Sequence, residues 1–200
     1  MGRLTRDRIE ANGRIMMHIR TLRKSVEATD DPVKTQERGF VQSLVRLPGN
    51  IYRQHGIQLF PLSCAHLNFP EMRDIDSTGD DTPTTEQVQL VEELRKKTAI
   101  GDNHVVVFLV RTIVVPTQGF IEGAAVVINN IPCVFVAEIA PEWVLAHELG
   151  HLLGLGHDSV DPSRLMYGSG PIVAKPRPVL VWDELRQIRS SPIFQPTVAV

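Results

Sequence analysis

Three histidines and one glutamate lie within the eleven-residue segment HELGHLLGLGH, which runs from His147 to His157 of this 200-residue chain. The whole chain has only seven histidines, so the segment is strongly enriched in them. Imidazole nitrogens are common zinc ligands, and histidine and glutamate are common proton-transfer groups in enzymes. The segment therefore predicts a metal site with an acid–base group beside it.

The spacing of these residues fits a helix that ends in a sharp turn. Positions i and i+4 of a helix lie about 6 Å apart along the axis and face the same way, so His147 and His151 can share one ion. Glu148 lies just off that face, where it can reach a bound water without being a ligand. Gly154 can end the helix, because glycine readily takes a left-handed backbone conformation. The returning chain can then bring His157 to the same ion, whereas a continuous helix would carry it about 9 Å too far.

The complete pattern is far more specific than its first five residues. H-E-x-x-H-x-x-G-x-x-H is expected by chance on the order of once in 10⁴–10⁵ chains of this length and composition. The alternative is a helix that carries incidental histidines, and the added glycine and third histidine argue against it. We therefore interpret the segment as a zinc site.

Hydrophobic periodicity and turn signals predict the elements that position this segment. Pro141, with Glu142 in the first turn, predicts a helix that carries the histidines to about Leu153. Residues 104–115 form a continuous β-branched run, typical of a strand that is covered on both faces. The other expected elements are a helix from 32 to about 54, a strand at 56–69, a helix from Thr84 or Thr85 to Gly101, strands at 120–128 and 131–139, and a closing helix at 181–191. Pro48 and Gly49 are expected to interrupt or end the first of these helices.

Composition is that of an ordinary globular protein, with 42% hydrophobic and 22% charged residues. Lys and Arg number 21 against 23 Asp and Glu, and the net charge of −2 argues against nucleic-acid binding. No apolar run approaches the roughly 20 residues of a transmembrane segment. Without a signal peptide we expect a cytoplasmic protein as written, or a secreted one if a leader was removed or a non-standard route is used.

The N-terminal region is basic and shows helical periodicity. Ile15, Ile19, Leu22 and Val26 recur at the spacing of one helical face, so residues 1–32 are predicted to form a helical extension. The two cysteines, Cys64 and Cys133, make no disulfide framework. They are expected to be partly buried thiols that could pair only if the protein is exported.

At these residues the sequence resembles the metzincin clan of zinc peptidases, and it is closest in motif to matrix metalloproteinase catalytic domains. AHELGHLLGLGH followed by DPSRLMYG carries the resemblance, over residues 146–168. It implies an α+β fold with a twisted mixed sheet, an antiparallel edge strand, an active-site helix, a Met-turn and a C-terminal helix. It also implies one zinc ion bound by His147, His151 and His157, with Glu148 as the general base and Met166 in the Met-turn.

The resemblance also implies a domain division, with a catalytic domain at 33–200 that has an upper part at 33–156 and a lower part at 157–200. The sequence departs from the matrix metalloproteinase pattern in two places. It lacks the upstream His-x-Asp loop that binds a second zinc and calcium ions, so no structural zinc or calcium is predicted. Tyr167 directly follows Met166, whereas a tyrosine ligand in the clan stands one residue further on. Tyr167 is therefore expected in the pocket wall or in packing, rather than as a ligand.

The implied activity is that of a zinc-dependent endopeptidase, in which Glu148 acts as the general base on a metal-activated water. A protein or peptide substrate would bind in extended form against an edge strand. The candidate strand is Phe120–Ile128, where Gly123 and the alanines after it would allow close approach, although an ordinary strand with small residues fits equally well. Residues 167–181 are expected to wall the pocket for the side chain that follows the scissile bond.

Two alternatives remain open at the level of sequence. HExxH peptidases of another type take a downstream glutamate as third ligand, and Glu184 is the candidate here. The chain could also be a zinc-stabilised peptide-binding module without catalysis, although an intact Glu148 argues against that hypothesis. Asp158 is a candidate hydrogen-bond partner for a ligand ring. The remaining histidines, for which surface or capping roles are expected, are His18, His55, His66 and His104.

Overall fold

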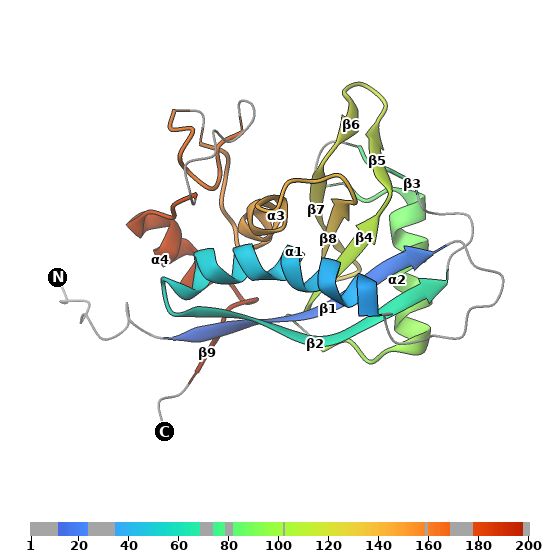
Figure 1. The fold of residues 1–200 in the computed structure, drawn as a ribbon, viewed down its shortest axis with the longest axis horizontal. Coiled ribbons are helices and arrows are strands. Elements are labelled where there is room, and N and C mark those ends of the chain that lie inside the picture. The colour runs from blue at the N-terminus through green and yellow to red at the C-terminus, as the bar shows by residue number, and fades with distance from the viewer. Residues whose placement is uncertain are drawn as a thin grey trace.

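A central sheet lies between two helices on one face and one helix on the other (Figure 1). The structure is a computed structural model, and it describes residues 12–23, 35–68, 74–78, 82–101, 103–158, 160–168 and 178–197. Its helices are α1 (Thr35–Arg53), α2 (Thr85–Lys97), α3 (Val144–Leu152) and α4 (Trp182–Ser190). Helices α1 and α3 pack on one face of the sheet, and α2 covers the other. Within the described residues, none of the helices is both long enough and apolar enough to cross a bilayer.

The main sheet is mixed, with the strand order β2-β1-β4-β8-β7. Its strands are β1 (Gly13–Arg23), β2 (Ile57–Asn68), β4 (Val105–Val110), β7 (Gly123–Ile128), β8 (Ile131–Ala137) and the short β9 (Gln195–Pro196), which pairs with β1. The first four strands in this order run parallel, β7 is an antiparallel edge beside β8, and the short β9 pairs antiparallel with β1. The predicted α+β class, mixed sheet and antiparallel edge strand are confirmed.

The predicted N-terminal helix is wrong for residues 13–23, which form strand β1. This strand lies inside the sheet between β2 and β4, so it belongs to the domain that was predicted to begin at residue 33. Ile15 and Ile19 do share a face, because a spacing of four residues fits the two-residue repeat of a strand as well as a helical turn. Pairing with two neighbours then decides in favour of the strand. Residues 1–11 and 24–32 of the predicted extension lie outside the described residues.

Two of the predicted strands are each divided by a bend, and both bends lie where the main sheet meets a second, smaller sheet. Residues 104–115 bend at Arg111, and residues 120–128 bend at Glu122. Beyond the bends, β5 (Thr112–Val115) and β6 (Gly119–Ile121) form a hairpin that joins β3 (Asp74–Asp76) in a second, three-stranded sheet. This hairpin projects from the main sheet in Figure 1. The bends place Glu122 where one sheet passes into the other.

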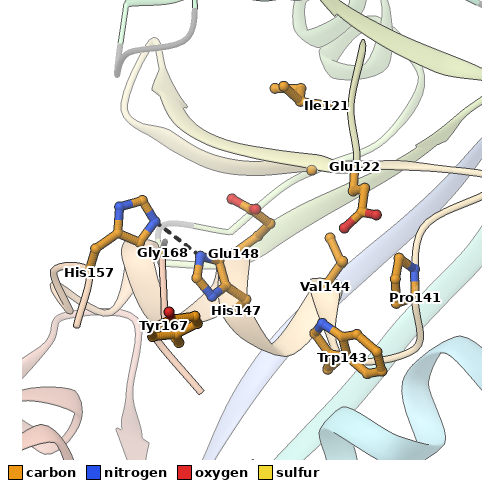
Figure 2. Close-up of a pocket in the computed structure, with 11 residues that line it drawn as sticks. Ile121, Glu122, Pro141, Trp143, Val144, His147, Glu148, His157, Tyr167 and Gly168 are labelled. Atoms are coloured by element: carbon orange, nitrogen blue, oxygen red, sulfur yellow. Dashed lines mark hydrogen bonds between the residues drawn. The ribbon is translucent and has the colours of Figure 1, made fainter. Parts of the chain in front are cut away.

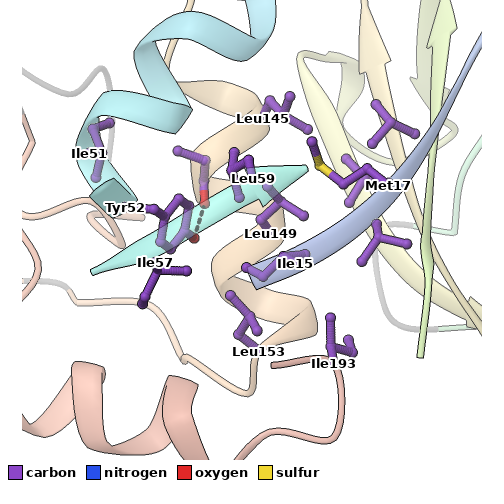
Figure 3. Close-up of a cluster of buried hydrophobic side chains, with 14 of the residues drawn as sticks. Ile15, Met17, Ile51, Tyr52, Ile57, Leu59, Leu145, Leu149, Leu153 and Ile193 are labelled. Atoms are coloured by element: carbon purple, nitrogen blue, oxygen red, sulfur yellow. Dashed lines mark hydrogen bonds between the residues drawn. The ribbon is translucent and has the colours of Figure 1, made fainter. Parts of the chain in front are cut away.

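The core that supports α3 is formed by β1, β2, α1 and α3 (Figure 3). Helix α1 continues through Pro48, where the sequence predicted an interruption or an end. Burial of Leu44 and Ile51 against the sheet offsets the hydrogen bond that proline cannot donate. The fully buried Tyr52 donates its hydroxyl proton to the carbonyl oxygen of Ala146 at 2.9 Å. This bond fixes α3 to α1, and burial raises the pKa of Tyr52 far above its ordinary value.

Candidate metal centre

Helix α3 carries His147, Glu148 and His151, and it ends where the sequence predicts. Gly154 has a φ of +94°, in the left-handed region that favours glycine. Its amide donates to the carbonyl of His151, and the amide of Leu155 donates to that of Gly150, both at 2.9 Å. These two bonds form a Schellman motif. The motif reverses the chain within three residues and so allows His157 to return to the helix.

The three predicted histidines converge on one point. Their Nε2 atoms are 3.2 Å apart between His147 and His151, 3.2 Å between His147 and His157, and 3.0 Å between His151 and His157. A tetrahedral zinc ion with Zn–N distances of about 2.0–2.1 Å separates its ligands by roughly 3.3–3.4 Å. Within the described residues, no other group of three or more metal-binding side chains comes as close together.

The hydrogen bonds made by the Nδ1 atoms show which nitrogen of each imidazole carries the proton. Nδ1 of His147 lies 2.7 Å from the carbonyl oxygen of Leu165, and Nδ1 of His151 lies 3.0 Å from that of Leu155. A carbonyl can only accept, so both Nδ1 atoms must carry the proton. The two Nε2 atoms then present lone pairs to each other, which repel unless a cation lies between them. This donor geometry fits zinc, since ligating histidines commonly donate the other ring N–H to a carbonyl.

The Met-turn lies directly against the helix, as the motif implied. Met166 is fully buried, and a Cβ atom added to Gly150 would come within 2.4 Å of its sulfur. Only glycine at position 150 therefore leaves room for this packing. The same turn supplies the Leu165 carbonyl that holds His147. A motif read from side chains could not reveal this contact, because it is made by the backbone.

Glu148 lies in the same cleft, with its side chain packed against the edge strand. It is only 8% exposed, and burial raises its pKa to about 8. A Cβ atom added to Gly123 would lie 2.7 Å from a carboxylate oxygen of Glu148. A glycine inside a strand commonly marks either a bulge or a close approach of another segment. Gly123, inside the predicted strand 120–128, marks a close approach of α3 to the edge strand.

Two hollows meet at this group of side chains. One is a cavity of about 330 Å³ that reaches from His147 and Glu148 to the start of α3 (Figure 2). Tyr167 and Gly168 line it, so the prediction that Tyr167 forms pocket wall is confirmed. The other hollow extends along Gly123 and the two alanines that follow it. Residues 169–177 of the predicted wall lie outside the described residues.

Glu184 does not join the centre, which contradicts its prediction as an alternative third ligand. Its carboxylate accepts from Arg164 at 2.9 Å and from the backbone amide of Val181 at 2.7 Å, and it stabilises the start of α4. The carboxylate of Asp158 accepts from the amide of Val160 at 2.8 Å and pairs with Arg164 at 3.3 Å. Neither carboxylate has a described contact with the rings of the centre.

Comparison with known protein families decides the class. The sequence model of the matrixin family matches residues 67–190, which is more than half of the chain and includes the whole centre. The chain belongs to the matrixin family. Matrixins are zinc metallopeptidases, so this matrixin carries a metzincin-type catalytic domain, as the motif predicted. Among curated proteins, no sequence matches it closely enough to count as a relative.

A solved structure supports the fold of this matrixin independently. Metalloproteinase-II from Bacteroides fragilis superposes over 90% of this chain with a TM-score of 0.58 and 15% sequence identity. At that identity the likeness extends to the fold alone. This matrixin spans 53% of the length of that chain. The predicted metzincin-like arrangement of sheet, active-site helix and C-terminal helix is thereby confirmed.

Proposed function

We propose that this protein is a zinc-dependent endopeptidase in which His147, His151 and His157 bind one catalytic ion and Glu148 is the general base. The observation that carries the proposal is the convergence of three Nε2 atoms within 3.2 Å. The backbone carbonyls behind His147 and His151 support the same reading, because they leave the two Nε2 lone pairs free for the ion. Glu148 follows His147 in the helix and lines the same cavity.

The chain's own groups account for the proton transfers of hydrolysis. His147, His151 and His157 would hold a zinc ion, which would supply a Lewis acid that polarises the scissile carbonyl and makes water easier to deprotonate. Glu148 is not needed as a ligand, so its carboxylate can take the proton from the attacking water. The same oxygen can then hand the proton to the amine that leaves. The close packing of Glu148 against Gly123 of the edge strand holds the carboxylate in place for both transfers.

The edge strand β7 is the proposed binding surface for an extended peptide. One side of β7 pairs with β8, and no described strand pairs with the other. A peptide can add there as a further strand, with its backbone amides and carbonyls paired to those of β7. The half-buried residues Gly123, Ala124 and Ala125 line the hollow beside Glu148. Their small side chains let a peptide backbone come close to the reacting groups.

Zinc content and peptide cleavage, measured on the same preparations, test this proposal. Glu148→Ala should keep about one zinc ion per chain and lose at least 10²–10⁴-fold in kcat/KM, which is the usual contribution of a general base. Removal of zinc by a chelator should stop cleavage, and added zinc should restore it. Glu184→Gln is the matched control and should keep both zinc and activity.

Two results would contradict the proposal in different ways. If Glu148→Ala cleaved peptides at the wild-type rate, Glu148 would not be the base. If the wild-type protein bound one zinc ion and cleaved nothing in a diverse peptide library, the zinc-stabilised binding module would be the better description.

A further inference from the structure

Two acidic residues line the cavity beside the metal centre: Glu148, which lies next to His147, and Glu122, which lies among apolar residues on the other side (Figure 2). Glu122 lies at the bend between β6 and β7, and Figure 2 shows its carboxylate directed toward the space between Val144 and Pro141. Trp143 and Ile121 complete the apolar lining on this side. The cavity volume of about 330 Å³ is at the small end of the roughly 300–1,000 Å³ that ligand pockets span. It suits a single side chain.

The backbone fixes Glu122 at this place. Its carbonyl oxygen accepts from the amide of Ala137 at 2.9 Å, and Gly123, the next residue, packs against Glu148 and Val144. The side chain of Glu122 is exposed, and among the described residues no donor or cation pairs with its carboxylate. The carboxylate is therefore available to a group that enters the cavity.

We propose that Glu122 makes this cavity select a lysine or arginine side chain of the substrate, an inference that rests on the endopeptidase function proposed above. Lysine and arginine have long apolar stems and a cationic end. The stem would lie against Val144 and Pro141. The cationic end would pair with Glu122 and could also contact the face of Trp143, since indole is the best aromatic partner for a cation.

The charges around the cavity favour the same occupant. None of its described lining residues is a lysine or an arginine. Glu122 would repel an acidic side chain, and a neutral apolar one would leave its carboxylate without a partner. His147 and His157 of the metal centre lie on the opposite side of the cavity from Glu122 (Figure 2). A side chain that extends toward Glu122 therefore carries its positive charge away from the ion.

The direction of β7 places this side chain after the scissile bond. A peptide that pairs antiparallel with β7 runs from Ala125 toward Gly123, and antiparallel pairing is slightly the more stable sense. Its N-terminal part then lies in the hollow along Ala124 and Ala125. Its C-terminal part passes Glu148 and enters the cavity that Glu122 lines. The residue whose nitrogen becomes the new amine is therefore the one whose side chain meets Glu122.

Cleavage of matched peptides tests the inference on the full-length, zinc-loaded protein. The peptides differ only at the residue after the cleaved bond, which is lysine, arginine, methionine, glutamine or glutamate. The wild-type protein should prefer lysine and arginine over methionine in kcat/KM, and Glu122→Gln should reduce that ratio about five-fold, the effect of an exposed ion pair. Glu122→Lys should reverse the order and favour glutamate. Glu142→Gln is the matched control, because Glu142 is exposed and adjacent to Trp143 but does not line the cavity.

Peptide binding separates this inference from the proposed function. Binding of the same peptides to zinc-loaded Glu148→Ala, measured by fluorescence anisotropy, should show the same preference for lysine and arginine. It should lose that preference when Glu122→Gln is added. Charge-dependent binding without any cleavage would overturn the endopeptidase function and keep this inference. Cleavage with no basic preference, or with a preference that Glu122→Gln leaves unchanged, would overturn this inference and keep the function.

Discussion

The protein has two places where histidine rings lie close together: the metal centre, and the pair formed by His18 and His104. Their ring nitrogens are equally far apart, but the groups around them differ. Nε2 of His18 lies 3.2 Å from Nδ1 of His104, as close as the nitrogens that converge at the centre. At the centre, backbone carbonyls accept from the Nδ1 atoms of His147 and His151. In the pair, Nδ1 of His18 meets the hydroxyl of Ser63 at 2.8 Å, and the buried Arg20 donates to the same hydroxyl at 2.9 Å.

The comparison shows that the spacing of nitrogens does not by itself make a metal site. A single proton between His18 and His104 satisfies both rings, and the guanidinium of Arg20 would repel a divalent ion. The centre offers three converging ring nitrogens, two of which present lone pairs, and no neighbouring cation among its described contacts. His18 is also only 5% exposed on a strand of the sheet, so its predicted surface or capping role is wrong.

The largest difference between the two groups should appear when one imidazole is removed from each. His157→Ala should weaken zinc binding more than 100-fold, since even the outer partners of a ligand contribute 10- to 100-fold. His104→Ala should leave zinc affinity unchanged. Competition with a chromophoric chelator measures both affinities. Equal zinc affinity in His157→Ala and the wild type would remove the third ligand from the proposal.

Disturbing the backbone that supports the centre should have a smaller effect than removing a ligand. Substitution of two glycines, each in a helix, can measure it. Gly150→Ala forces a methyl group onto the sulfur of Met166, whereas the same change at Gly49 in α1 meets nothing within 4 Å. Gly49→Ala should stabilise the fold by about 0.5–1 kcal/mol, and Gly150→Ala should destabilise it by about 1 kcal/mol through overpacking.

Zinc affinity separates the same two variants. Gly150→Ala should also weaken zinc binding up to about ten-fold, because a shifted Met-turn moves the carbonyl that holds His147. Denaturant unfolding and chelator competition measure the two effects. If Gly150→Ala matched Gly49→Ala both in its free energy of unfolding and in its zinc affinity, the Met-turn would not position the ligand.

The smallest effect should come from protonation of the buried pair. Burial, together with the charges of Arg20 and His104, lowers the pKa of His18 to about 4, against about 6.5 in the unfolded chain. Between these values the unfolded chain takes up a proton that the folded chain does not. The contribution of His18 to the free energy of unfolding is therefore fully present above pH 6.5 and is lost as the pH drops toward 4. With allowance for solvent screening, the loss attributable to His18 at pH 5 is about 1 kcal/mol.

Zinc-free samples are needed for this comparison, because the ligands of the centre also titrate. Unfolding free energies at pH 7 and pH 5 should differ by about 1 kcal/mol less in His18→Gln than in the wild type. The glutamine keeps a polar group near Ser63. An identical pH dependence in both proteins would show that His18 is protonated as readily in the fold as outside it.

The sequence alone determined the core of the centre, because local chain geometry fixes it. His147 and His151 face one way on any helix, and Gly154 is the residue best suited to the turn that returns His157. The end of α3 followed from an equally local signal, whereas the helix begins at Val144 rather than at the predicted Pro141 and the antiparallel edge strand was implied only by the family resemblance. The sequence could not decide between helix and strand for residues 13–23, because their spacing of four fits both repeats and only pairing with β2 and β4 resolves it.

Tertiary structure decided what surrounds the ligands. The bends at Arg111 and Glu122 arise where two sheets meet, and no local pattern marks them. The carbonyl of Leu165 reaches His147 only after the Met-turn packs on Gly150. Glu122 lines one cavity with Val144 and Trp143 only because the edge strand lies over the start of α3. Short-range spacing thus specified which groups could bind an ion, while contacts between distant segments set their hydrogen-bond partners and the shape and charge of the cavity beside them.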